Sequence, residues 1–172
     1  MPETPEIRIR PADRADAAAV AALVNKLNLL HDKPENATGE AILRDGFEAE
    51  PGFSVLLAEA GDRPVGYALY HPLYNTDIPG WGLWLADLFV EPELRRLGIG
   101  RRLLAAVAAQ AVAAGAVSVW WAVLSENRRA RDFYAVLGAR DEDARVLELD
   151  GDALAALAEE GRAEEGRAAA GA

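Results

Sequence analysis

The sequence predicts a mixed α/β domain in which helices flank a twisted, mostly antiparallel sheet. Two apolar stretches, 53–60 and 65–71, are joined by Gly61–Pro64, which is typical of a β-hairpin. The run Trp81–Val90 is apolar almost throughout, as in a central strand that is buried on both faces. A helix and another strand follow this run, and a strand–helix–strand unit of this kind forms a parallel pair with a right-handed crossover.

The amino-terminal half is expected to hold one strand and two helices. Residues 7–10 alternate with period two, as in a short strand. Asp13 is the expected cap of a helix that ends near His31, and Asp16 would complete a capping box. One face of this helix carries apolar residues at helical spacing: Val20, Leu23, Val24, Leu27 and Leu30. A second helix, capped by its first residue, is expected over Thr38–Phe47.

Glycines mark the elements of the carboxyl-terminal half. Gly98–Gly100 should open a helix and Gly115 should end it, with one stripe of buried residues: Leu103, Leu104, Val107 and Ala111. A strand is then expected over Val117–Leu124 and a helix over about Arg128–Leu137. The apolar residues of Val146–Leu149 predict a last strand.

Length and composition narrow the class of protein. The chain has 172 residues, of which 51% are hydrophobic, and its apolar stretches fall short of the roughly 20 residues of a membrane span. We assign residues 1–152 to a single domain and residues 153–172 to an Ala-, Gly- and Glu-rich helix with a frayed tail. Because the chain has no cysteine and Met1 does not begin an export signal, we expect a cytoplasmic location.

The charge and the histidines argue against several kinds of partner. A net charge of -10 repels nucleic acid and acidic membranes, so neither is expected as a partner. Much of this acidity lies beyond Asp141, where it fits a solvated tail. With His31 and His71 as the two histidines and no His-Glu-x-x-His pattern, we expect no metal site.

The segment Arg95–Gly100 is a candidate anion site. Its two glycines permit a tight turn that exposes successive N–H groups, and the helix behind them adds the positive end of its dipole. A dinucleotide fingerprint would need glycine where Leu103 stands, and a nucleoside triphosphate loop would need Gly-Lys-Ser or Gly-Lys-Thr. On these residues alone, a plain strand-to-helix turn stays open as the alternative.

Longer stretches give this segment a context. In this order, Leu85–Leu104 and Ser125–Gly138 resemble the acyl-CoA motif and the second conserved motif of the GNAT N-acetyltransferase superfamily, within a resemblance that covers roughly residues 7–150. The chain also resembles the spermidine/spermine (diamine) N-acetyltransferase branch, which includes thialysine acetyltransferases, through Ile9–Asp13, Asp45–Phe47, Val65–Tyr70 and Asp87–Val90. The resemblance implies a sheet that splays at its parallel central pair and holds acetyl-CoA, as co-substrate, in the split.

The same resemblance implies which residues bind the coenzyme. The N–H groups of Arg96–Arg101 would hold the pyrophosphate, and Leu88 and Val90 on the central strand would hydrogen-bond the pantetheine arm as an added strand. Asn127 would be a further contact or a helix N-cap, and the two roles are compatible. The expected cofactor-binding residues are Leu88, Phe89, Val90, Arg95, Arg96, Leu97, Gly98, Ile99, Gly100, Arg101 and Asn127.

Catalytic residues are also implied by the resemblance. Tyr134 corresponds to the family's general acid, and a phenol of pKa about 10 can protonate a departing thiolate of pKa about 8.5. A buried aromatic residue would explain Tyr134 equally well, because Phe133 and Tyr134 lie on an apolar helix face. The branch has an adjacent Glu-Asp pair on the central strand, of which only Asp87 remains beside Ala86. Asp87 is the candidate base or anchor for a cationic acceptor.

The predicted activity is transfer of an acetyl group from acetyl-CoA to a primary amine by direct attack. The acceptor would be a diamine, a polyamine or a lysine-like amino acid, with His31 near the mouth of its site. Transfer to a protein or antibiotic amine stays open, as does a non-catalytic acyl-CoA sensor, which the alanine at position 86 would tolerate. The resemblance also implies a homodimer.

Overall fold

The computed structural model describes residues 6–170. The chain forms two compact units, Met1–Ala122 and Val123–Ala172, and each is described by itself. None of the helices in the described part combines the length and the apolar character that crossing a membrane requires.

The first unit is built on a five-stranded sheet whose strands are adjacent in chain order: β1 (Ile7–Pro11), β2 (Ser54–Ala60), β3 (Arg63–Asn75), β4 (Gly80–Val90) and β5 (Val119–Trp121). The first four strands pair antiparallel, and β4 pairs with β5 in parallel. The predicted mostly antiparallel sheet with one parallel pair is therefore confirmed. So is the hairpin between β2 and β3, where Gly61 adopts a left-handed φ of 62°.

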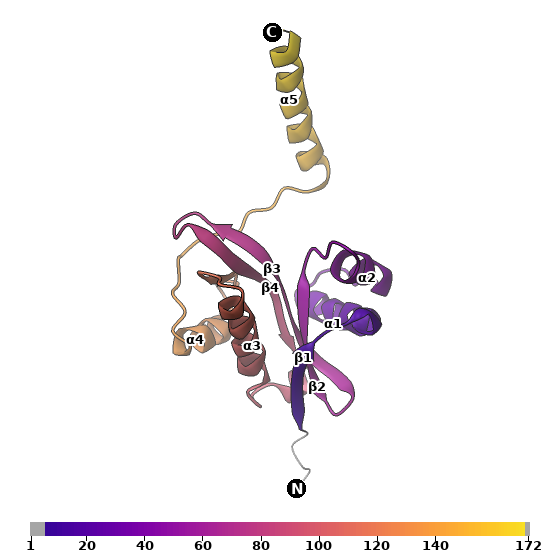
Figure 1. Cartoon of the computed structure of the whole chain (residues 1–172), viewed down its shortest axis with the longest axis vertical. Helices are drawn as coiled ribbons and strands as arrows, with labels where there is room; N and C mark the ends of the chain where they lie inside the picture. The colour runs from indigo at the N-terminus through magenta and orange to yellow at the C-terminus, as the bar shows by residue number, and fades with distance from the viewer. Residues whose placement is uncertain (1–5, 171–172) are drawn as a thin grey trace. The chain divides into compact units, whose positions relative to one another are not determined.

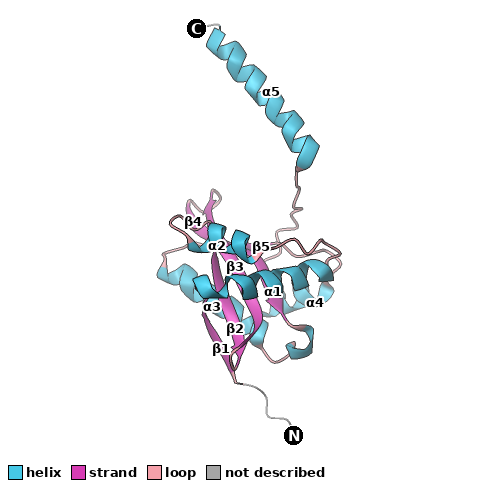
Figure 2. Ribbon diagram, turned by 90° about the vertical axis from the view of Figure 1, so that its right-hand side faces the viewer, coloured by secondary structure: helices cyan, strands magenta, loops and turns pink. Residues whose placement is uncertain are grey.

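Helices cover both faces of this sheet. One face carries the short 3₁₀ turn η1 (Arg14–Asp16), α1 (Ala17–Leu30) and α2 (Gly39–Phe47), and the other face carries α3 (Ile99–Ala113), as Figure 1 shows. Figure 2 views the sheet from the α1 side. The core under α1 consists of Val20, Leu23, Val55, Leu57, Tyr67 and Phe89. Leu30 departs from the predicted buried stripe, because it is 50% exposed at the end of α1.

The start of α1 is fixed to the sheet by charged side chains. The predicted capping box is confirmed: Asp13 accepts from the N–H of Ala15, and Asp16 accepts from the N–H of Asp13, both at 2.8 Å. Arg10 on β1 bonds both Asp16 and the buried Glu59 of β2. These hydrogen bonds from Arg10 hold the pKa values of both carboxyl groups below their ordinary range. The network ties the start of α1 to strands β1 and β2.

On the other face, α3 buries the stripe that the sequence predicts. Leu103, Leu104, Val107 and Ala111 are all buried, and Gly115, with φ 70°, lies just past the helix end. Arg102 leaves this helix to donate to the Ile7 carbonyl of β1 at 2.7 Å. The 3₁₀ turn η2 (Pro92–Leu94) carries the chain from β4 toward α3.

The second unit contains α4 (Arg128–Val136) and α5 (Gly151–Ala170). The predicted strand Val146–Leu149 is wrong: this segment is irregular and exposed, and no strand pairs with it. Three apolar residues in four predict a strand by composition, but a strand also needs a partner for its backbone groups. The helix beyond residue 150 is longer than the short one expected, because its Ala-rich sequence has high helix propensity.

Candidate functional site

The parallel pair of strands separates part of the way along β4. Leu83–Leu85 pairs with Val119–Trp121, and Leu83 donates its N–H to the Ser118 carbonyl at 3.0 Å. Within the described residues of the first unit, no strand pairs with this edge of β4 beyond Leu85. The strand predicted over Val117–Leu124 is therefore shorter than expected. The second half of β4 presents an open backbone edge.

A bulge lies where this open edge begins. Across the β3–β4 pair, Leu69 is opposite Asp87 whereas Tyr70 is opposite Leu85. Ala86 is therefore one extra residue on β4. A bulge of this kind changes which residues face each neighbouring strand.

The direction of two N–H groups shows the result. Leu83, before the bulge, points its N–H toward β5, whereas Glu91, just after β4, donates its N–H to the Val65 carbonyl of β3 at 2.9 Å. In a strand without a bulge, the N–H groups of these two odd-numbered residues would point to the same neighbouring strand. The bulge reverses the alternation of backbone directions along β4. Leu88 and Val90 therefore point their backbone groups to the open edge. These are the two residues expected to bind a pantetheine arm.

A turn with two left-handed residues follows β4 and leads into α3. Arg96 has φ 70° and Gly98 has φ 76°, and Gly98 caps the helix without any side-chain cap. The first N–H bonded within this helix is that of Arg102, which donates to the Gly98 carbonyl at 3.0 Å. The N–H groups of Ile99–Arg101 precede it and have no partner inside the helix. They form the amide-lined cradle that the sequence predicts for an anion.

Gly100 leaves room in this cradle. A Cβ built on it would meet only Val90 Cγ2, at the ordinary contact distance of 3.9 Å. The fold itself therefore tolerates a side chain at this position. A glycine here would allow a ligand to approach the backbone closely.

Four arginines lie around the same turn, and two of them form hydrogen bonds within the fold. Arg102 is used by the fold, since it bonds Ile7, and Arg95 donates through Nε to the Val90 carbonyl at 3.0 Å. Val90 thus keeps its N–H, but not a free carbonyl, at the open edge. Arg96 and Arg101 are exposed, and they add positive charge beside the cradle.

The other residues expected to bind the coenzyme have different surroundings. Phe89 is 2% exposed and packs in the core under α1, with its backbone toward β3, so this geometry gives it no contact with the open edge. Ile99 is the first residue of α3 and its side chain is buried, so that only its N–H is available. Leu97 is an exposed residue of the turn.

Asp87 lies at the start of the open half of β4, on the α1 face of the sheet. Its Oδ2 accepts a hydrogen bond of 2.9 Å from the Tyr67 hydroxyl. Burial raises the pKa of Asp87 above its ordinary value, although the bond from Tyr67 and the charge of His31 oppose the rise. His31, the C-cap residue of α1, is therefore close enough to act on Asp87 electrostatically. Asp87 and His31 are the two residues predicted for the acceptor site.

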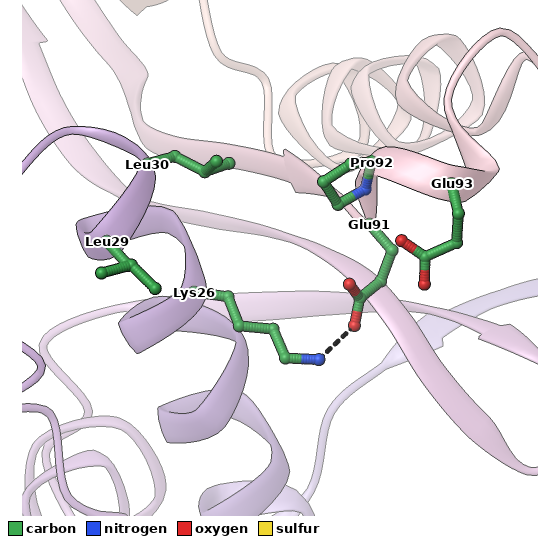
Figure 3. A pocket seen from close by; sticks show the side chains of 6 residues that line it. All are labelled: Lys26, Leu29, Leu30, Glu91, Pro92 and Glu93. Atoms are coloured by element: carbon green, nitrogen blue, oxygen red, sulfur yellow. Dashed lines mark hydrogen bonds and ion pairs between the residues drawn. The ribbon is translucent and has the colours of Figure 1, made fainter.

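Figure 3 shows a pocket of about 300 Å³ beside the end of β4, lined by Lys26, Leu29, Leu30, Glu91, Pro92 and Glu93. Lys26 forms an ion pair with Glu91, whose side chain is 7% exposed. Leu29 and Leu30 form an apolar wall and are 60% and 50% exposed. The sequence did not predict this pocket. The one available signal was Leu30, the last apolar residue of the α1 stripe, which the core does not bury.

The pocket and Asp87 lie along the same side of the sheet. Alternation beyond the bulge places Asp87, Phe89 and Glu91 on the α1 face, and four residues of strand span about 13 Å. Leu30 of the pocket precedes His31 in the chain. An elongated ligand at Asp87 therefore has the pocket within reach.

Two further predicted site residues belong to the second unit. Asn127 is confirmed as the N-cap of α4, since its Oδ1 accepts from the N–H of Ala130 at 3.1 Å. Tyr134 is half-buried with its ring 5.1 Å from that of Phe133, and burial raises its pKa. Their position relative to Asp87 and the cradle stays a prediction. Among residues 6–170, no three His, Cys, Asp or Glu side chains lie together as a metal site would require.

Comparison with known proteins agrees with this geometry. The model of the acetyltransferase (GNAT) family matches residues 20–139. A thialysine N-epsilon-acetyltransferase of Bos taurus is 34% identical over 167 residues, covering 88% of this chain and 97% of the relative. An L-ornithine N5-acetyltransferase of Arabidopsis thaliana is 39% identical over 93 residues, 54% of this chain and 41% of the relative. The solved structure of an aminoglycoside N-acetyltransferase in complex with CoA shares the fold, with a TM-score of 0.69 and 21% identity over 88% of this chain and 99% of that one.

Proposed function

Because this chain belongs to the acetyltransferase (GNAT) family and is an N-acetyltransferase, we propose that it moves an acetyl group from acetyl-CoA to a primary amine of a small cationic acceptor. The observation that carries the proposal is the amide-lined cradle of Ile99–Arg101 next to the open edge of β4. One feature binds a diphosphate, and the other aligns an extended arm that leads away from it.

Most of the residues that we assign to the coenzyme carry groups that the described part of the fold leaves without a partner. The N–H groups of Ile99–Arg101 hold the pyrophosphate, and Arg96 and Arg101 neutralise its charge. Leu88 and the N–H of Val90 bond the pantetheine arm along the open edge. Asn127 caps α4 and makes a further contact in the manner of the family.

The chemistry needs one group that takes a proton and one that gives a proton. Asp87 accepts a proton from the acceptor ammonium, and the neutral amine then attacks the thioester carbonyl carbon, so that a C–N bond forms and the C–S bond breaks. A strand N–H at the open edge stabilises the oxyanion. Tyr134 donates its proton to the departing thiolate and regains one from solvent, and a phenol of raised pKa stays protonated for this task.

We assign the remote end of the acceptor to the pocket of Figure 3. The wall of Leu29, Leu30 and Pro92 suits methylene groups. Lys26 and Glu91 place an ammonium beside a carboxylate, which complements the zwitterionic head of an amino acid, whereas a diamine offers only a second cation to Lys26. Two of the relatives named above are a thialysine N-epsilon-acetyltransferase and an L-ornithine N5-acetyltransferase, which supports a diamino acid as the acceptor.

A panel of amines tests this proposal through thiol release from acetyl-CoA. Lysine and 1,5-diaminopentane form a matched pair, since they differ only by the carboxylate. We expect kcat/KM for lysine to exceed that for the diamine by about tenfold or more, the value of one good ionic contact. Spermidine and an aminoglycoside test the other acceptor classes. Absence of thiol release with every amine would contradict the enzymatic assignment.

Tyr134→Phe separates the enzyme from a non-catalytic acyl-CoA sensor. We expect kcat to fall by about 100-fold because the general acid is lost. The Kd for CoA, measured by calorimetry, should stay within about twofold, since the change removes one hydroxyl outside the cradle. A sensor would bind CoA equally well and show no turnover before or after the change.

A further inference from the structure

Tyr67 is a buried tyrosine whose hydroxyl has one specific partner. Its side chain is fully buried in the core under α1, surrounded by apolar residues of that core. The hydroxyl donates to Asp87 Oδ2 at 2.9 Å across the β3–β4 pair. Burial and the nearby Asp87 charge raise the pKa of Tyr67 far above its ordinary value, so the phenol is always a donor. A phenylalanine would fill the same volume, so packing alone does not explain the hydroxyl.

The two oxygens of Asp87 have different surroundings as a result. Within the described residues, the bond from Tyr67 to Oδ2 is the one hydrogen bond that this carboxylate accepts. The Oδ1 atom has no protein donor among these residues. Besides Tyr67, the titratable group that acts on Asp87 is His31, the exposed C-cap residue of α1, whose charge lowers the pKa of Asp87. One oxygen is thus fixed by the fold, and the other is available to a ligand.

We propose that Tyr67 is the positioning residue for amine deprotonation: it holds Oδ2 of Asp87 so that Oδ1 accepts the proton of the acceptor ammonium. The inference rests on the proposed function and goes beyond it, because it assigns one oxygen of the base and the residue that orients it. The proton moves from the acceptor nitrogen to Oδ1, and Asp87 returns it to solvent after the product leaves. Tyr67 itself keeps its proton throughout.

Two physical effects follow from this bond. A carboxylate bonded at one oxygen loses the rotational freedom of its plane, which aims the free oxygen. A donor on a carboxylate also favours the ionised form, so Tyr67 keeps a buried acid available as a base at neutral pH. Removal of the hydroxyl should weaken both effects and leave the coenzyme cradle unchanged.

The test is Tyr67→Phe, with the pH dependence of kcat/KM as the readout. Loss of one charge-assisted hydrogen bond should move the acidic limb upward by about one pH unit. Tyr70→Phe is the matched control, because Tyr70 is also a buried tyrosine of β3 but its hydroxyl contacts Ser54. The control should leave the limb in place. An acidic limb that stays unchanged in Tyr67→Phe would overturn the inference.

Two further measurements separate this inference from the proposed function. In a protein that already carries Asp87→Asn, adding Tyr67→Phe should cause no further shift of the limb, because the carboxylate is gone. Carbon-13 NMR of the labelled Asp87 carboxyl group needs no turnover, and its titration midpoint should rise by about one unit in Tyr67→Phe. If no amine is acetylated, the proposed function fails, and the NMR titration still decides whether Tyr67 sets the ionisation of Asp87. Equal midpoints in the two proteins would refute that claim.

Discussion

The two halves of β4 differ in what they present to the same edge of the sheet. The closed half, Gly80–Leu85, is paired with β3 throughout and also with β5 over Leu83–Leu85, whereas in the open half Asp87–Val90 is paired with β3 alone. The backbone groups of the closed half form their hydrogen bonds within the protein, whereas the open half keeps backbone groups available to a ligand. A single strand thus holds the sheet together at one end and offers a binding edge at the other.

The glycines of the two regions differ in whether the surrounding fold has room for a side chain. In the closed half, a Cβ on Gly82 would lie 2.8 Å from the Ser118 carbonyl oxygen, so glycine is required by the close approach of the chain before β5. Next to the open half, a Cβ on Gly100 would have ample room. The glycine at position 82 is therefore explained by the fold, whereas steric crowding does not explain the glycine at position 100.

Deletion of Ala86 should have the largest effect, because it removes the difference between the halves. Without the extra residue, alternation would continue unbroken, and either Phe89 leaves the core or the β5 pairing is lost. We expect a loss comparable with the whole stability of a domain, roughly 5–15 kcal/mol. Circular dichroism during urea unfolding measures it. A cooperative transition near the original midpoint would show that the bulge does not reverse the strand.

Gly82→Ala should damage the closed half only. The added methyl group meets backbone atoms of Ser118, which move only if the β4–β5 pair shifts, at a cost of about 2 kcal/mol. The urea midpoint should fall accordingly, while the Kd for CoA in the folded protein should change by less than about threefold. A variant as stable as the parent would mean that the pair adjusts freely.

Gly100→Ala should have the opposite result. Alanine is the better helix former, so stability should stay equal or rise by up to about 1 kcal/mol. The methyl group lies where a phosphate would approach the backbone, so the Kd for CoA should weaken by about tenfold, or 1.4 kcal/mol. Unchanged CoA affinity would contradict the cradle, whatever happens to stability.

Asp87→Asn should have the smallest effect on stability, and the size of this effect depends on pH. Because burial raises the pKa of Asp87, the folded protein binds this proton more tightly than the unfolded chain does. The stability that the proton contributes is present below the ordinary pKa and is lost as the pH rises through the folded value. We therefore expect the variant to gain stability relative to the parent as the pH rises above about 4, with the full gain reached once the pH exceeds the folded value. A gain that shrinks with rising pH would contradict the direction of the shift.

Local sequence signals predicted the parts of the fold that depend on neighbours along the chain. The capping box of Asp13 and Asp16, the end of α3 at Gly115 and the central run Trp81–Val90 all follow from local patterns. Gly98 and Gly100 likewise located the cradle. These features are encoded within a few residues, so a pattern can detect them.

What the sequence did not predict depends on pairs that are distant along the chain. The bulge at Ala86 is one residue within a continuous apolar run, where alternation leaves no trace. Lys26 and Glu91 are 65 positions apart, and Tyr67 and Asp87 are 20 apart, so each pairing exists only after the sheet has formed. Val146–Leu149 failed for the same reason, because an apolar pattern does not supply a strand with its partner.

The left-handed backbone of Arg96 has a consequence for how this enzyme can evolve. A side chain in that conformation costs roughly 1 kcal/mol that glycine would avoid, so the chain gives up stability to keep a guanidinium in the turn. Laboratory selection for heat tolerance alone should therefore replace Arg96 with glycine or asparagine. Selection under scarce coenzyme should retain the arginine.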